Sequence, residues 1–182
     1  KYGYCSFGIS YDYTKPAAEN AKLVIAEVNE NMPRTLGDSF IHVSDIDYIV
    51  EVSHPLIELK PAKLGEVEKS IGRYCASLIE DGSTLQLGIG AIPDAVLMFL
   101  KDKKDLGIHS EMISDGVVDL VNAGVINNSK KTLHPGKIVV TFLMGTKKLY
   151  NFVDDNPIIA SYPVDYVNDP RIIMQNYKMV AI

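Results

Sequence analysis

Two short motifs place potentially reactive groups at the ends of predicted strands. In LQLGIGAIPDAVL a buried strand is predicted to break at Gly88 and Gly90, with a helix following from Pro93. In HSEMISDG the next predicted strand ends beside Glu111. Because ligands of open α/β sheets bind at the carboxyl ends of the strands, we predict that both motifs border one crevice.

The glycine corner has the features of an anion-binding turn. Gly88 and Gly90 tolerate φ > 0 and close backbone approach, and Pro93 suits the first turn of a helix. The N–H groups there could stabilise an anion or a developing oxyanion, although Asp94 would compete for the same positive helix end. A turn that only reverses the chain fits the glycines equally well. The predicted binding residues are Gly88, Ile89, Gly90, Ala91, Ile92 and Pro93.

Two kinds of bound group are disfavoured. A dinucleotide-binding turn requires G-x-G-x-x-G, and this chain has Pro93 where the third glycine should allow close packing of helix on strand. A nicotinamide cofactor is therefore not predicted. The histidines, cysteines and carboxylates show no spacing typical of metal ligands, so no metal site is predicted.

The polar neighbours of Glu111 are interpreted as structural. His109 would share a strand face with Glu111 and could orient it, but a structural role is favoured because attack by a carboxylate needs no general base. Ser114 or Asp115 is predicted to cap the helix that follows. The lysine pairs are interpreted as solvated surface rather than phosphate ligands. They are Lys103-Lys104, Lys130-Lys131 and Lys147-Lys148.

The order of predicted elements indicates an α/β fold with a parallel sheet. A helix is predicted from Thr14 or Pro16, and after residue 64 strand-like and helix-like segments alternate, as in βαβ units. Apolar residues at helical spacing predict an amphipathic helix in the segment GEVEKSIGRYCASLIEDG. They are Val67, Ile71, Tyr74, Leu78 and Ile79. The aperiodic, proline-containing stretch 53–64 predicts a boundary, with residues 1–58 closing one α/β domain and residues 59–182 opening a second.

Composition excludes several classes of partner. The net charge is −5 and the basic residues are scattered, so no nucleic-acid partner is predicted. The longest strongly apolar run, Ile138 to Met144, is far shorter than the ~20 residues of a membrane-spanning helix, so no membrane partner is predicted. Cys5 and Cys75 lie far apart and are expected to be free thiols in a reducing cytoplasm.

The two motifs together resemble the acetyl-CoA hydrolase/transferase family of CoA-transferases. GIGAIPDAVLMFL followed by GIHSEMISDGVVDLV carries the resemblance, and SFGISYDYTKPAAENAKLVIAEVN, PRTLGDSFIHVSDID and LHPGKIVVTFLMGTKKLY extend it over essentially the whole chain. These flanks are most similar to members that act on 4-hydroxybutyrate, or on butyrate and acetate.

The resemblance implies two related α/β domains with the active site between them. It implies that Glu111 is the covalent nucleophile, that Gly88 to Pro93 line the CoA and acyl site, and that Ser6 to Thr14 approach the same cleft from the first domain. It also implies a homodimer that uses coenzyme A as a substrate, without a permanently bound cofactor.

The chemistry expected of Glu111 is double displacement. A carboxylate can attack a thioester and still form a reactive acyl derivative, and it needs hydrogen bonds that keep it ionised. Two alternatives remain: an acyl-CoA hydrolase, in which water intercepts the intermediate, and a non-catalytic module that binds CoA or a nucleotide. An assay with and without acetate as acceptor separates transfer from hydrolysis.

Overall fold

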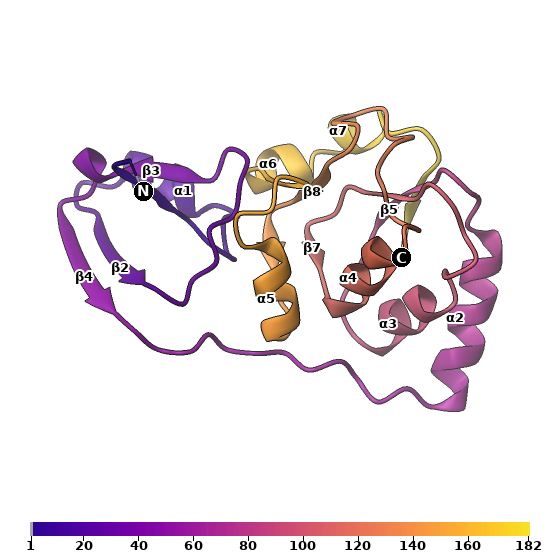
Figure 1. The fold of residues 1–182 in the computed structure, drawn as a ribbon. Coiled ribbons are helices and arrows are strands. Elements are labelled where there is room, and N and C mark those ends of the chain that lie inside the picture. Colours follow the sequence, from indigo (N-terminus) through magenta and orange to yellow (C-terminus); the bar gives the residue numbers. More distant parts are fainter. Residues whose placement is uncertain (1) are drawn as a thin grey trace.

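The chain forms two regions joined by an extended connection (Figure 1). The computed structural model describes residues 2–182. The first region covers residues 2–52 and the second covers residues 66–182. Residues 53–65 between them form neither helix nor strand. This connection contacts the second region, since Leu59 N–H donates to the Gly145 carbonyl at 2.9 Å and the Tyr150 hydroxyl donates to the Ile57 carbonyl at 2.8 Å.

The first region contains two small, separate sheets. One is antiparallel and pairs β1 (Tyr4–Ser6) with β3 (Phe40–His42). The other is parallel and pairs β2 (Ile25–Asn29) with β4 (Tyr48–Val52). Helix α1 (Thr14–Asn20) begins at one of the two residues predicted for it, and the 3-10 helix η1 (Val43–Asp45) links β3 to β4.

The second region is built on parallel strands, which confirms the predicted α/β class. Its first sheet has the order β11 (Met179–Ala181), β5 (Thr84–Gln86), β6 (Gly107–Ile108). A bridge between His109 and Val139 extends this order to β8 (Ile138–Val140), which pairs with β10 (Ile159–Ser161). The chain thus proceeds from β5 to β10 and then returns to place β11 on the other side of β5. This reversal puts a topological switch point, where α/β proteins bind ligands, at the end of β5.

Helices alternate with these strands as the sequence predicts. They are α2 (Glu66–Leu78), α3 (Ala91–Met98), α4 (Asp115–Asn122) and α5 (Lys147–Val153). Two further helices between β10 and β11 were not predicted: α6 (Val164–Val167) and α7 (Pro170–Ile173). Each is four residues long, which is too short to show a helical period.

The apolar face of α2 points toward solvent, which the amphipathic pattern did not indicate. Val67, Tyr74 and Leu78 are 68%, 74% and 82% exposed. Of the apolar residues predicted at helical spacing, only Ile79, which caps the helix at its C-terminus, is buried. Helix α2 instead packs on α3 through its small residues. A Cβ on Gly72 would lie 2.7 Å from the backbone carbon of Ala95, so only glycine permits this approach. The apolar spacing therefore predicted the helix correctly. Its buried face, however, is the one that carries Gly72 and Ala76, because these small residues allow close packing on α3.

Candidate active site

Glu111 lies at a bend between two strand segments. Strand β6 ends at Ile108 and β7 (Met112–Ile113) begins directly after Glu111; β9 (Phe142–Leu143) pairs with β7. The backbone N–H groups of Thr141 and Phe142 both donate to the Glu111 carbonyl, at 3.0 and 2.8 Å. Two residues opposite one form a bulge, which re-aims the side chain at that point. The Glu111 side chain is exposed at this bend.

The Glu111 carboxylate has one amide partner. The Nδ2 of Asn168 donates to Glu111 Oε2 at 2.6 Å. Asn168 follows α6 directly, and its own N–H donates to the Val164 carbonyl at 2.8 Å. This hydrogen bond fixes the position of one carboxylate oxygen of Glu111. Asn168 is not recognisable from the sequence, because a single asparagine in a loop carries no motif; the Asp-Pro pair after it marks only a turn.

The glycine corner lies against the segment that carries Glu111. The hydroxyl of Ser110 accepts from Leu87 N–H at 2.9 Å and is within 3.1 Å of the Leu87 carbonyl oxygen. On the far side of both loops, the Ser114 hydroxyl donates to Asp94 Oδ1 at 3.3 Å. These contacts join the two loops at both of their ends. The structure thus brings the Gly88–Pro93 segment and Glu111 to the same edge of the sheet.

The glycine corner leaves the N-terminus of α3 without a side-chain cap. Gly90 precedes α3 with φ = +112°, a conformation that favours glycine, and no side chain caps the helix. Helix α3 starts at Ala91, two residues before the predicted Pro93. Asp94 does not compete for its own helix end, because its carboxylate accepts from Ser114 and from Ala62 N–H. The N–H groups of Ala91 and Ile92 therefore have no intrahelical acceptor, and Pro93 has no N–H.

The first region reaches the same place through Ser10, Tyr11 and Asp12. Ser10 forms a bridge with Phe142, and the N–H groups of Tyr11 and Asp12 donate to the Thr141 carbonyl at 3.1 and 3.2 Å. Burial raises the pKa of Asp12 above its ordinary value, the hydrogen bond from Ser10 lowers it, and the charge of Glu111 raises it. The structure thus brings part of the predicted Ser6–Thr14 segment alongside Glu111.

Two of the polar neighbours differ from expectation. No side chain caps α4, since the Asp115 carboxylate accepts instead from Thr146 N–H and Oγ1, at 2.9 and 2.6 Å, and fixes the start of α5. Lys131 is only 4% exposed, which contradicts its assignment to solvated surface. Its Nζ donates to the carbonyls of Ile108 and Lys137, both at 2.7 Å, and burial lowers its pKa to about 7.

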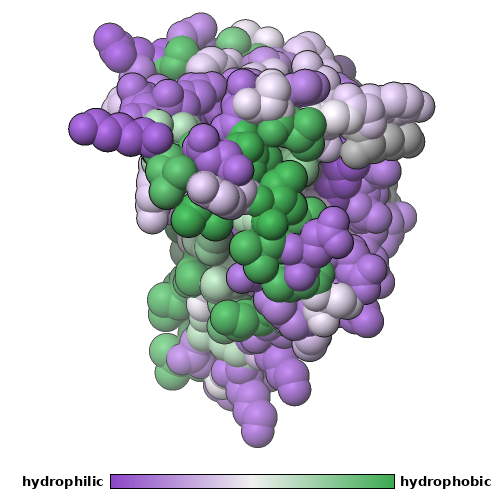
Figure 2. Space-filling view, turned by 90° about the vertical axis from the view of Figure 1, so that its left-hand side faces the viewer, coloured by the Kyte–Doolittle hydropathy of each residue, from purple (hydrophilic) through white to green (hydrophobic). Residues whose placement is uncertain are grey.

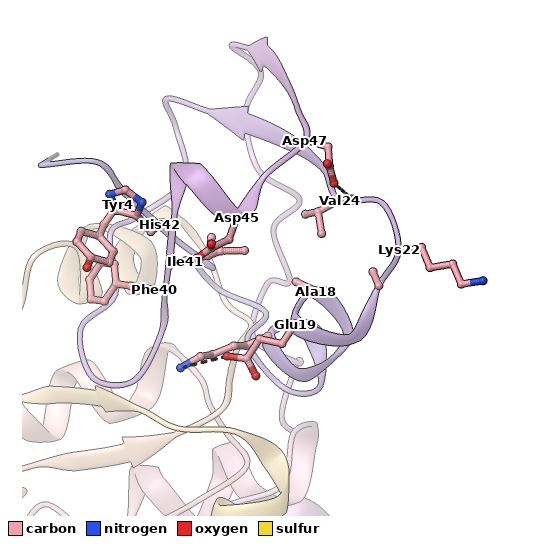
Figure 3. Close-up of a pocket in the computed structure, with 12 residues that line it drawn as sticks. Tyr4, Ala18, Glu19, Lys22, Val24, Phe40, Ile41, His42, Asp45 and Asp47 are labelled. Atoms are coloured by element: carbon pink, nitrogen blue, oxygen red, sulfur yellow. Dashed lines mark hydrogen bonds and ion pairs between the residues drawn. The ribbon is translucent and has the colours of Figure 1, made fainter.

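A separate cavity of about 600 Å³ lies in the first region, between α1 and β3 (Figure 3). Lys15 and Glu19 of α1 and His42 of β3 contribute to its lining. None of the residues predicted to form the site lines it. Within residues 2–182, no three His, Cys, Asp or Glu side chains are grouped so as to hold a metal ion. Over the same residues, every helix is too short or too polar to span a membrane.

Two family models match the ends of the chain. Residues 1–58 match the acetyl-CoA hydrolase/transferase N-terminal domain, and residues 145–182 match the C-terminal domain of the same family. The stretch between the two matches holds both the glycine corner and Glu111.

Curated relatives match the chain over its whole length. It is 81% identical over 182 residues to 4-hydroxybutyrate coenzyme A transferase of Clostridium kluyveri, and 48% identical to succinyl-CoA:cyclohexane-1-carboxylate CoA transferase of Geobacter metallireducens. A butyryl-CoA:acetate CoA-transferase of Anaerostipes caccae is 41% identical over 93% of the chain. The chain spans 42%, 42% and 39% of these relatives, less than half of each.

Solved structures share the fold. The crystal structure of 4-hydroxybutyrate CoA-transferase from Porphyromonas gingivalis superposes with a TM-score of 0.96 at 54% identity, and covers all of this chain and 46% of its own. RipA from Yersinia pestis superposes with a TM-score of 0.95 at 46% identity, over 98% of this chain and 42% of its own.

Proposed function

Because the chain belongs to the acetyl-CoA hydrolase/transferase family, we propose that the protein is a CoA-transferase with Glu111 as its covalent nucleophile. It moves CoA between short-chain acyl-CoA and carboxylic acids, with 4-hydroxybutyrate, butyrate and acetate as the candidate acids. The observation that carries the proposal is the pair of contacts, Ser110 with Leu87 and Ser114 with Asp94, that hold Glu111 beside the glycine corner.

The reaction proceeds by double displacement. An oxygen of the Glu111 carboxylate attacks the thioester carbonyl, the carbon–sulfur bond breaks, and CoA thiolate leaves an acyl-glutamyl anhydride. The thiolate then attacks the glutamyl carbonyl, which releases the first acid and forms a glutamyl-CoA thioester. A second carboxylate reverses both steps. Glutamate suits this chemistry because its carboxylate is both nucleophile and leaving group.

Neighbouring groups supply orientation and charge stabilisation. Asn168 fixes one oxygen of the Glu111 carboxylate through its 2.6 Å hydrogen bond and leaves the other free to attack. The open N–H groups at the start of α3 stabilise the oxyanion that forms at either carbonyl. Gly88 to Pro93 line the CoA and acyl site, and Gly88 leaves room where a Cβ would lie 3.3 Å from the Ile182 carbonyl oxygen.

The proposal extends to organisation. Residues 1–58 belong to a first α/β domain and residues 59–182 to a second, with the active site between them; the Ser10 and Asp12 contacts to β9 and Thr141 support this. Free Cys5 and Cys75 agree with a cytoplasmic enzyme. Coenzyme A enters as a substrate, and assembly into a homodimer remains an expectation from the family resemblance.

Intact-mass analysis tests the role of Glu111. The complete polypeptide that carries these residues is incubated with butyryl-CoA, and we expect a mass increase equal to CoA less one water, which Glu111→Gln abolishes. Asp119→Asn, which neutralises an exposed carboxylate on α4, should keep the adduct. An adduct of equal yield in Glu111→Gln would rule out Glu111 as the nucleophile.

Hydrolysis is the second candidate, and the exposure of Glu111 favours it because water can reach the intermediate. Product formation from butyryl-CoA is therefore followed with and without acetate. Acetyl-CoA that accumulates only with acetate identifies a transferase, whereas free CoA released at the same rate in both identifies a hydrolase. Tight CoA binding with neither product identifies a non-catalytic module.

A further inference from the structure

His109 is fully buried two residues before Glu111 and does not contact the carboxylate. Its exposure is 0%, and its Nε2 lies 2.9 Å from the Val167 carbonyl oxygen. A carbonyl oxygen only accepts hydrogen bonds, so Nε2 must carry the proton. The other ring nitrogen, Nδ1, is buried and has no partner within residues 2–182. His109 therefore makes one side-chain hydrogen bond, from Nε2–H to the Val167 carbonyl at the end of α6.

The acceptor of His109 directly precedes the partner of Glu111 in the chain. Val167 ends α6, and Asn168 follows it and donates to Glu111 Oε2 at 2.6 Å. Two hydrogen bonds thus join residues 109 and 111 of one segment to residues 167 and 168 of another. If Asn168 were held only by its bond to Glu111, its side-chain amide could rotate away. The second bond, from His109 to Val167, closes a ring of residues and fixes the direction of the Asn168 amide.

We propose that His109 is a positioning residue that orients the Asn168 amide on Glu111 through the Val167 carbonyl. It is not a catalytic residue, because it touches neither the reacting carboxylate nor the site of attack. The inference rests on the proposed function of Glu111 for its effect on rate, but the geometry it requires exists without turnover.

The surroundings of His109 lower the pKa of its imidazole. Burial lowers the pKa of His109 below its ordinary value, the bond to Val167 opposes that shift, and the charges of Lys131 and His134 lower the pKa further. His134 holds the same helix from another side, with Nε2 2.7 Å from the Tyr166 hydroxyl. These surroundings favour the neutral imidazole, in which Nε2–H donates to the Val167 carbonyl.

Substitutions that keep or remove the donor test the proposal in the complete polypeptide. His109→Leu removes the N–H, and His109→Gln keeps an amide that can reach Val167. We expect His109→Leu to slow formation of the glutamyl-CoA adduct about tenfold to a hundredfold, as small misplacements of reacting groups do, with KM for butyryl-CoA nearly unchanged. His109→Gln should restore most of the rate.

A double-mutant cycle separates positioning from general support of the fold. If His109 acts through Asn168, His109→Leu should cost little further rate once Asn168→Ala is present. An equal loss in both backgrounds, or no loss in either, would overturn the inference.

An NMR measurement tests whether His109 orients the Asn168 amide, and it does not depend on enzyme activity. The side-chain amide signals of Asn168 should move toward those of the Glu111→Ala protein in His109→Leu and stay in place in His109→Gln. Unchanged signals in His109→Leu contradict the inference even if adduct forms normally. Absence of adduct in the unsubstituted protein contradicts only the proposed function, since the amide signals still report the ring.

Discussion

The two regions of the molecule use the same kinds of elements but bury their side chains very differently. In the second region, β8 and β10 are buried along their whole length. In the first region, β4 is mostly exposed, with Tyr48, Ile49 and Val50 at 63%, 46% and 50%. Among residues 2–65, Tyr11 and Pro33 are the only apolar side chains that are buried. The core of the described chain is therefore the core of the second region.

Surface hydropathy shows the same contrast. Figure 2 views the molecule from the side of the first region, and apolar side chains gather there at the surface. A groove of about 710 Å³ opens beside β2, with Leu23, Ile25 and Met32 among its lining residues. The first region is joined to the second largely by backbone pairing and polar contacts, such as the Gly37 to Ser161 bridge and the Arg34 to Asp155 ion pair. Glu111 thus belongs to the well-packed second region. Asp12, whose N–H donates to the Thr141 carbonyl near Glu111, belongs to the loosely packed first region.

The contrast predicts a large difference between two isoleucines in parallel strands. Ile138 in β8 is 0% exposed and Ile49 in β4 is 46% exposed. Ile138→Ala should lower the free energy of unfolding by about 2–5 kcal/mol, because it leaves a cavity in the core. Ile49→Ala should lower it by only about 0.5 kcal/mol. Urea unfolding measures both, and similar losses would show that the first region has a core of comparable strength.

The helices and strands could be predicted from the sequence, but the surfaces that each of them packs against could not. Alternation of strands and helices after residue 64 identified the parallel fold, because periodicity is a local property. The exposed stripe of α2 shows the limit, since a helical period says which residues share a face but not what covers it. The Gly88–Pro93 corner and Glu111 could be predicted as site residues because each follows a predicted strand. The roles proposed for Asn168 and His109 rest on contacts between segments nearly sixty residues apart, which spacing does not reveal.

The junction of the two regions offers the next test. Gly37 has φ = +115°, and a Cβ there would lie 2.5 Å from both the N and O atoms of Ser161. Gly37→Ala should therefore force the first region away from β10 and lower the free energy of unfolding by about 1–3 kcal/mol. Hydrogen exchange should quicken at the Ser161 N–H, which is bonded to Leu36. Gly124→Ala is the control, because it also has positive φ, +76°, but meets no atom within 4 Å. Equal losses in the two variants would mean that backbone strain, rather than the junction, sets the effect.

The smallest difference expected between the two regions is in how a lysine charge affects the pH dependence of stability. In the first region Lys15 pairs with Asp38 at the surface, whereas in the second region Lys131 is buried on two backbone carbonyls. Burial lowers the pKa of Lys131 from 10.5 to about 7 in the folded protein. Between these two values the unfolded chain binds more protons than the folded one, so stability should rise with pH. The slope is at most about 1.4 kcal/mol per pH unit, because one proton is involved.

Lys131→Met should flatten this slope. Methionine fills a similar volume but leaves the carbonyls of Ile108 and Lys137 without their donor, so the variant should be less stable than the unsubstituted protein at pH 9. The two stabilities should converge as the pH falls toward 7, where the unsubstituted protein must bury a charge. Urea unfolding at pH 7, 8 and 9 measures the slopes, with Lys130→Met as the control for removing the exposed neighbouring lysine. Parallel slopes in Lys131→Met and Lys130→Met would show that the second region tolerates a charged Lys131 as readily as the first tolerates its surface pairs.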